Sequence, residues 1–402
     1  MFDGFIRLVR EIYQTEQFIP LHEPRFAGNE KQYLLDVIDS TFVSSVGPYV
    51  GEFETKIAEY TGAKHAIATV NGTAALHVAL LLAGVEPGEE VITQAVTFVA
   101  TCNAIHYCGA EPVFVDVDAA TLGLSPAALT NFLDCHGERR DGGIYNKTSG
   151  KRIAACLPMH SFGHPCDMLG LLQVCEGYGI PVVEDAAEAL GSRIVGSNSF
   201  APSAVSANEL ASTPATKYAK HCGALGKLGV LSFNGNKIIT TGGGGMILTD
   251  DDELARHAKH LTTTAKLPHA WRFAHDQIGY NYRMPNLNAA LGLAQLEQLP
   301  AFVERKRALA QRYLDWAQTN GAQIVVEPTG ARSNYWLNAL LLDDVRQRNA
   351  FLEYSNAQGV MTRPLWELMA DLPMYKHCQR DSLTQSRRLA ERLVNVPSSV
   401  VL

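Results

Sequence analysis

The sequence has few of the features that mark several other classes of protein. Its eight cysteines form no C-x-x-C pair and follow no regular spacing, a usage typical of reduced, packed thiols in a cytoplasmic protein. Basic residues are fewer than acidic ones, with 34 lysines and arginines against 41 aspartates and glutamates. The net charge of −7 argues against broad binding of nucleic acid or anionic membranes, so any bound phosphate must be held by local groups.

A long uninterrupted apolar run is missing as well. The uncharged stretches 65–85 and 91–110 are long enough to span a bilayer, but Asn71-Gly72-Thr73 breaks the first and scattered polar residues interrupt the second. Residues 1–17 have the pattern of an amphipathic helix with charged residues throughout, and not that of a signal peptide. We therefore expect no membrane span.

The order of the expected elements indicates an α/β protein. With 402 residues and 47% hydrophobic content, the chain can bury a large core and is expected to form two domains, 1–265 and 266–402. Alternating strands and helices predict a mostly parallel sheet in the first domain. The expected strands are 66–70, 90–93, 112–117, 153–158, 181–185, 229–233 and 245–248, and the expected helices are 73–82, 99–107, 126–133 and 168–178.

The pattern changes after residue 250, which favours a smaller α+β domain at the carboxyl end. There the sequence predicts helices at 252–260, 286–296, 301–319 and 346–358 and a strand at 335–342. One segment, about 196–226, is rich in small polar residues and has little periodicity, so we expect an insertion or lid in the first domain.

Three short motifs suggest a site for a phosphorylated cofactor. Lys237 follows Ser232-Phe233-Asn234-Gly235-Asn236 and precedes a cluster of four glycines, so its amine can reach a cofactor aldehyde such as that of pyridoxal phosphate. The alternative is a lysine that faces solvent at the end of a strand. Upstream, Asn71-Gly72-Thr73 interrupts a strand and begins a helix, and such a turn directs free amides at a phosphate. An ordinary turn is the alternative there.

The strand 181–185 ends in an acidic pair, Glu184-Asp185. In open α/β sheets ligands bind at the carboxyl edge of the strands, where Asp185 would lie. Its carboxylate could keep a pyridine nitrogen protonated, and the alternative role is to cap a following helix. His160 and His164 are four residues apart, but Gly163 and Pro165 favour a loop, so no metal site is expected.

Together, the motifs N-G-T-A-A-L, E-D-A-A-E, S-F-N-G-N-K, T-G-G-G-G and G-Y-N-Y-R resemble the DegT/DnrJ/StrS family of sugar aminotransferases. The resemblance implies the aspartate-aminotransferase fold (fold type I), with pyridoxal 5'-phosphate as cofactor. Within the family, the chain resembles enzymes that aminate carbon 4 of UDP-linked 2-acetamido-4-keto-2,6-dideoxyhexoses, on routes to bacillosamine and legionaminic acid. This narrower resemblance depends on three short segments, 20–24, 44–47 and 363–366.

The resemblance also implies roles for individual residues. Lys237 would bond to the cofactor aldehyde, and Asp185 would face the pyridine nitrogen. Gly72, Thr73 and Ser232 would hold the phosphate. The remaining residues implied are Phe98, which would stack on the cofactor ring, Glu188, which stands where the family commonly has glutamine, and Asn281, which would reach the phosphate of a neighbouring subunit.

These roles predict an enzyme that acts as a homodimer with shared active sites. Its substrates would be a nucleotide keto-sugar and L-glutamate, with the nitrogen transferred to the 4-ketone of the UDP-sugar. The alternatives are another keto-sugar, with a 3-ketone or a dTDP or GDP carrier, or a cofactor-binding regulator without turnover.

Overall fold

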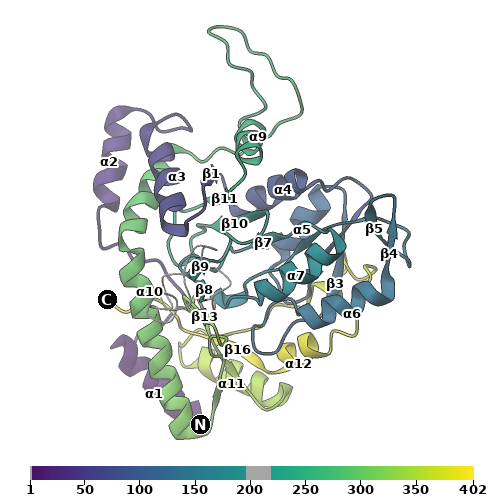
Figure 1. Ribbon diagram of the computed structural model, residues 1–402. Coiled ribbons are helices and arrows are strands. Elements are labelled where there is room, and N and C mark those ends of the chain that lie inside the picture. The colour runs from purple at the N-terminus through teal and green to yellow at the C-terminus, as the bar shows by residue number, and fades with distance from the viewer. Residues whose placement is uncertain (1, 196–218) are drawn as a thin grey trace, which may run out of the picture.

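In the computed structural model, which describes residues 2–195 and 219–402, one continuous sheet forms the centre of the larger part of the chain (Figure 1). It consists of two hydrogen-bonded groups of strands. Two isolated parallel β-bridges, between Cys156 and Val182 and between Met159 and Asp185, join the groups. The first group is β1 (His65–Thr69), β11 (Gly245–Thr249), β10 (Leu228–Ser232) and β7 (Val183–Asp185), and the second is β3 (Glu111–Val115), β2 (Glu90–Gln94) and β6 (Ile153–Leu157).

The sheet is mostly parallel, as the sequence predicts. Pairing is parallel between β10 and β7, between β2 and β3 and between β2 and β6, whereas β11 runs antiparallel to both of its neighbours. Strands β2 and β6 are buried along their whole length, and β6 is apolar throughout, as is typical of a buried parallel strand. The carboxyl ends of β7 and β10 therefore lie at the same edge of the sheet.

Helices cover the faces of this sheet (Figure 1). Those at 99–107 and 168–178 begin and end as predicted, and the others differ by a few residues. The helices are α4 (Gly72–Ala83), α5 (Val99–Tyr107), α6 (Pro126–His136), α7 (Met168–Tyr178) and α9 (Asp252–Thr262), and a hairpin of β4 (Gly137–Arg140) and β5 (Gly143–Asn146) follows α6.

One prediction is wrong in the second half of the chain. The expected helices 286–296 and 301–319 are a single helix, α10 (Asn286–Asn320), which contains Pro300. Proline removes one backbone hydrogen bond, which favours a break. The helix continues because buried residues on both sides of Pro300, Leu299 and Phe302 among them, hold it against the core, and because α2 (Glu30–Ser40) and α3 (Pro48–Thr61) pack along its first half.

The carboxyl-terminal part has its own antiparallel sheet. This sheet has the order β12 (Gln323–Ile324), β14 (Asn338–Leu341), β16 (Leu393–Val396) and β15 (Arg363–Pro364), and α11 (Val345–Ala357) and α12 (Thr384–Arg392) accompany it. Helix α1 (Phe2–Tyr13) packs here, since Phe5 and Val9 share a core cluster with Tyr313 and Phe351. The boundary at residue 265 stays a prediction, although this packing would assign α1 to the second part.

The expected insertion falls largely outside the described residues. Residues 196–218 are not described, whereas β9 (Ala219–His221) pairs with β8 (Arg193–Val195), which also pairs with β13 (Ala331–Arg332). All eight cysteines are free thiols, and only Cys135 is exposed. Within 2–195 and 219–402, no helix has both the length and the apolar character needed to cross a membrane.

Candidate active site

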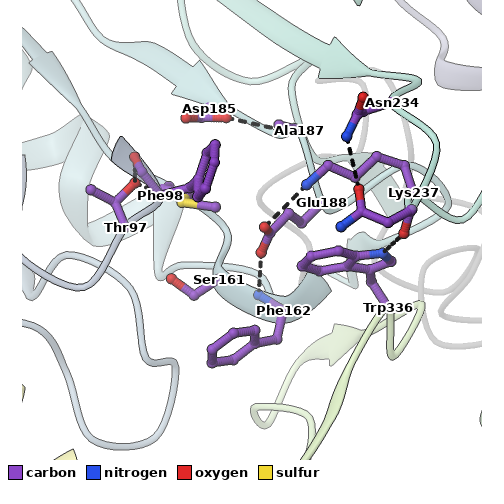
Figure 2. A network of polar contacts seen from close by, with 12 residues as sticks. Thr97, Phe98, Ser161, Phe162, Asp185, Ala187, Glu188, Asn234, Lys237 and Trp336 are labelled. Atoms are coloured by element: carbon purple, nitrogen blue, oxygen red, sulfur yellow. Dashed lines mark hydrogen bonds and ion pairs between the residues drawn. The ribbon is translucent and has the colours of Figure 1, made fainter. Parts of the chain in front are cut away.

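A cavity of about 300 Å³ lies where β7 and β10 end and α4 begins. This volume is at the lower end of the range typical of small-molecule sites, roughly 300–1,000 Å³. Figure 2 shows its central side chains, which come from elements far apart in the sequence. Seven of the eight predicted site residues line it, namely Gly72, Thr73, Phe98, Asp185, Glu188, Ser232 and Lys237.

A larger groove of about 890 Å³ lies between α9 and the loop that follows it. Its charges are largely paired with one another near the surface, as in the contacts of Lys259 with Glu54 at 2.6 Å and of His260 with Asp276 at 2.7 Å. Such exposed pairs are common on protein surfaces and indicate no chemistry. We therefore place the candidate site in the smaller cavity.

The turn before α4 provides free backbone donors. Asn71 caps the helix, because its side chain accepts a hydrogen bond from the Ala74 amide at 2.7 Å. The first amides of a helix have no acceptor within it, so those of Gly72 and Thr73 are available to an anion. Space is tight, since a Cβ atom on Gly72 would lie 3.0 Å from Cβ of Ser232. The glycine thus lets the end of β10 bring the Ser232 hydroxyl close to these amides.

Asp185 is the last residue of β7 and is only 2% exposed. Its carboxylate accepts hydrogen bonds from Thr101 Oγ1 at 2.7 Å and from the Ala187 amide at 3.2 Å. Burial raises the pKa of Asp185, while Thr101, Ala187 and Lys237 oppose that rise. Turns and not a helix follow it, so the alternative role of capping a helix at 186–190 does not apply. A buried carboxylate held in this way suits a cationic ring nitrogen.

Lys237 lies in the connection between β10 and β11, and its side chain is 12% exposed. Its amine is 4.1 Å from the centre of the Trp336 ring and 3.2 Å from Oε1 of Glu188. Trp336 is itself fixed, because its ring nitrogen donates to the Asn236 carbonyl at 2.7 Å. The amine is therefore directed into the cavity and not into solvent (Figure 2).

Glu188 is the second buried carboxylate of the site, and it is 2% exposed. Its other oxygen, Oε2, accepts a hydrogen bond from the Phe162 amide at 2.8 Å. Burial raises the pKa of Glu188 to about 7, an effect that Lys237 reduces and Asp185 reinforces. This carboxyl group can thus change its protonation state near neutral pH.

Two further aromatic side chains, Phe98 and Trp366, line the cavity. Phe98 stands at the start of α5 and is 49% exposed, so a flat ligand could cover its ring. Trp366 lies 6.3 Å from Phe98, centre to centre, and stacks on Phe162 at 5.0 Å. The residue-by-residue predictions did not include Trp336, Trp366 or Thr101. They are ordinary core residue types, and only their long-range contacts bring them to the cavity.

Asn281 is the predicted residue that does not line the cavity. It is exposed and pairs with Thr263 at the base of a long loop, residues 264–280, which we call the arm. The arm projects beyond α9 from the body of the protein (Figure 1). Its side chains Trp271, Phe273 and Ile278 are 83%, 80% and 84% exposed. A role for Asn281 in a neighbouring subunit stays a prediction.

The two histidines four residues apart have separate surroundings. His160 Nε2 bonds to buried Glu184 at 3.0 Å, whereas both ring nitrogens of His164 are buried without a partner. In the described part of the chain, no three His, Cys, Asp or Glu side chains gather as metal ligands do.

The residues at the cavity fit pyridoxal phosphate. A lysine amine for the aldehyde, an aspartate for the ring nitrogen and a helix N-terminus with a hydroxyl for the phosphate meet in one enclosure of suitable size. The tight approach of Gly72 to Ser232 leaves the helix amides open to that phosphate.

Comparison with known proteins agrees with this reading. Residues 24–402 match the DegT/DnrJ/EryC1/StrS aminotransferase family. The chain is 36% identical to the GDP-perosamine synthase of Caulobacter vibrioides over 94% of its length and 93% of that protein. It is 35% identical to the GDP-perosamine synthase of Escherichia coli O157:H7, over 95% and 93% of the two chains.

A solved structure, the aminotransferase TlmJ from Streptoalloteichus hindustanus, matches with a TM-score of 0.80 and 28% identity over 95% of this chain and 93% of that one. Members of the family are pyridoxal-phosphate enzymes, and related structures include forms with the cofactor. The chain belongs to the DegT/DnrJ/EryC1/StrS family and is a pyridoxal-phosphate-dependent sugar aminotransferase of fold type I.

Proposed function

We propose that the enzyme transfers the amino group of L-glutamate to the ketone at carbon 4 of a nucleotide-linked sugar. The observation that carries this proposal is the Lys237 amine, enclosed with Asp185 and the α4 N-terminus in a cavity of about 300 Å³. A neutral lysine amine is a good nucleophile towards carbonyl carbon, and once released it is positioned to move a proton between substrate atoms.

Each residue of the cavity has a defined task in this proposal. Asp185 would hold a positive charge on the ring nitrogen, and the amides of Gly72 and Thr73, with the Ser232 hydroxyl, would hold the phosphate. Phe98 would cover one face of the ring. When bound, pyridoxal phosphate supplies an aldehyde for the amine nitrogen and a ring that takes up the electron pair of the substrate carbon. The enclosed walls exclude water from the reacting atoms.

We infer a GDP-linked keto-sugar as the first candidate acceptor. The support is that relatives which align over nearly the whole chain are named GDP-perosamine synthase. A UDP-linked 2-acetamido-4-keto-2,6-dideoxyhexose, which the motifs at 20–24, 44–47 and 363–366 favour, is the second candidate. Both acceptors would be aminated at carbon 4, and they differ in the nucleotide carrier.

The test is a panel of GDP-, UDP- and dTDP-linked keto-sugars, each incubated with L-glutamate and the purified enzyme. Amination of the GDP-linked 4-keto sugar, followed by mass spectrometry of the product, would support the first candidate. Amination of the UDP-linked sugar alone would favour the second. Amination of a 3-keto sugar, with both 4-keto sugars left unreacted, would contradict the proposal.

We also infer that the enzyme acts as a homodimer in which Asn281 completes the site of the other subunit. The three arm side chains that are at least 80% exposed support this inference, because monomeric proteins rarely expose large apolar groups together. A Lys237→Ala chain and an Asn281→Ala chain, each inactive alone, should regain part of the activity when mixed. Hybrids without activity, despite folded subunits, would contradict a shared site.

A further inference from the structure

The carboxylate of Glu188 is positioned against the amine that the proposed function makes reactive. Its Oε1 lies 3.2 Å from Nζ of Lys237, and the two side chains are only 1% and 12% exposed. An ion pair removed from water in this way pays a high desolvation cost that the attraction only partly offsets. Transfer of the shared proton from Nζ to Oε1 would remove both charges, and with them the desolvation cost.

The position of Glu188 is held at two further points. Oε2 accepts from the Phe162 amide at 2.8 Å, and the backbone carbonyl accepts from Asn334 Nδ2 at 2.9 Å. The turn that presents Phe162 depends on Gly163, which has φ of +89° and where a Cβ atom would lie 1.9 Å from Asn334 Oδ1. These contacts leave one oxygen, Oε1, directed at Lys237 (Figure 2).

Few charged groups act on this carboxyl group. Lys237 approaches it from the β10–β11 connection, and Asp185 from the end of β7, while Phe162 and Trp336 on the other sides carry no charge. Burial raises the pKa of Glu188 to about 7, with Lys237 lowering it and Asp185 raising it. Both protonation states are therefore accessible near neutral pH, as a proton acceptor that is used repeatedly requires.

We propose that Glu188 is the proton acceptor for Lys237. In the step, an N–H bond at Nζ breaks and an O–H bond forms at Oε1. The nitrogen keeps the electron pair and becomes the nucleophile, and the carboxylate becomes a neutral acid. The reverse transfer returns the proton when the lysine amine is released. The step needs no oxidant or reductant, and it rests on the proposed role of Lys237.

The test compares the holoenzyme with Glu188→Gln in single turnovers with L-glutamate, followed by the visible absorbance of the cofactor from mildly acidic to mildly alkaline pH. In the wild type the rate should fall as the pH drops through about 7, because the protonated carboxyl group accepts no proton. In Glu188→Gln this acid limb should vanish, and the rate at neutral pH should fall by roughly 10²–10⁴-fold.

A second readout is independent of turnover. Infrared difference spectra should contain a band of protonated carboxyl that titrates near pH 7 in the wild type and is missing in Glu188→Gln. The matched control is Glu176→Gln, the same chemical change at an exposed position of α7, which should leave both readouts as in the wild type. If the glutamine variant does not fold, Glu188→Asp should keep an acid limb at a lower rate.

Two outcomes would overturn the proposal. One is an acid limb and a carboxyl band that persist in Glu188→Gln. The other is a uniform loss of rate with an unchanged pH midpoint, which would mean that Glu188 only positions Lys237. A failure of the proposed function can be distinguished from a failure of the Glu188 proposal, because it would appear as unchanged cofactor absorbance in Lys237→Ala.

Discussion

The cavity and the arm differ in how far their side chains are buried. In the cavity, the side chains of Asp185, Glu188 and Lys237 are largely buried, and each of these three has a polar partner within the same chain. In the arm, Trp271 and Phe273 are at least 80% exposed and have no comparable packing. One chain thus provides seven of the eight predicted site residues at the cavity. The large apolar side chains of the arm, in contrast, are left uncovered by the described part of the same chain.

This difference separates two kinds of residue in the proposed mechanism. Residues of the cavity should affect chemistry within each chain, and residues of the arm should affect association. A cavity variant that changes association, or an arm variant that changes chemistry within one chain, would contradict this division. The following four variants run from the largest expected effect to the smallest.

Lys237→Ala should have the largest effect. Loss of the amine removes both the bond to the cofactor and the proton carrier, so turnover should fall by roughly 10²–10⁴-fold or more. Borohydride treatment followed by peptide mass spectrometry should attach the cofactor to Lys237 in the wild type and to no residue in the variant. Cofactor fixed on another lysine would contradict the assignment.

Asp185→Asn should rank second. The amide keeps the shape and most hydrogen bonds but cannot balance a positive ring nitrogen. A bias of two pK units corresponds to about 2.7 kcal/mol, or roughly a hundredfold in rate. The measurement is kcat together with the absorbance of the bound cofactor. A variant with full activity would mean that Asp185 serves the fold alone.

The paired change Trp271→Ser and Phe273→Ser should act on association. Truncation of one large aromatic side chain at the centre of an interface often costs about 2 kcal/mol or more, so the loss of a single such contribution should weaken the dimer by at least roughly thirtyfold. Sedimentation equilibrium would measure this change, and circular dichroism would show that each chain remains folded. An unchanged dimer would remove the arm from the interface.

Gly163→Ala should have the smallest of these effects, on stability. The left-handed backbone costs a non-glycine residue about 1–2 kcal/mol, and the new Cβ would press on Asn334. Thermal unfolding would measure the loss. The control is Gly177→Ala in α7, where no heavy atom lies within 4 Å and alanine favours the helix. Equal melting temperatures for the two variants would contradict this account.

Much of the large sheet is predictable because its strands are short, apolar and bounded by turns. No helix was predicted at α2 or at α3. In α2 only Glu30 and Val37 are buried, so its apolar periodicity is weak, whereas α3 has four buried residues at helical spacing and was predictable. Helix α10 was divided at Pro300, since a local rule cannot include the tertiary packing that holds the two halves together. The UDP carrier of the acceptor was predicted from short motifs and stays a prediction, while relatives that align along nearly the whole chain are named GDP-perosamine synthase.

The sequence alone determined the groups that stand at the ends of strands, Asp185, Ser232 and the turn at Gly72, because these positions depend on local chain geometry. The sequence motif and the family resemblance together predicted Lys237 as the amine for the cofactor, and this role stays a prediction. Only the tertiary structure brought Glu188 within 3.2 Å of that amine and Trp336 against it. The physical reason is that such contacts join segments 49 and 99 residues apart (237 − 188 and 336 − 237), whose approach is decided by the packing of the whole chain.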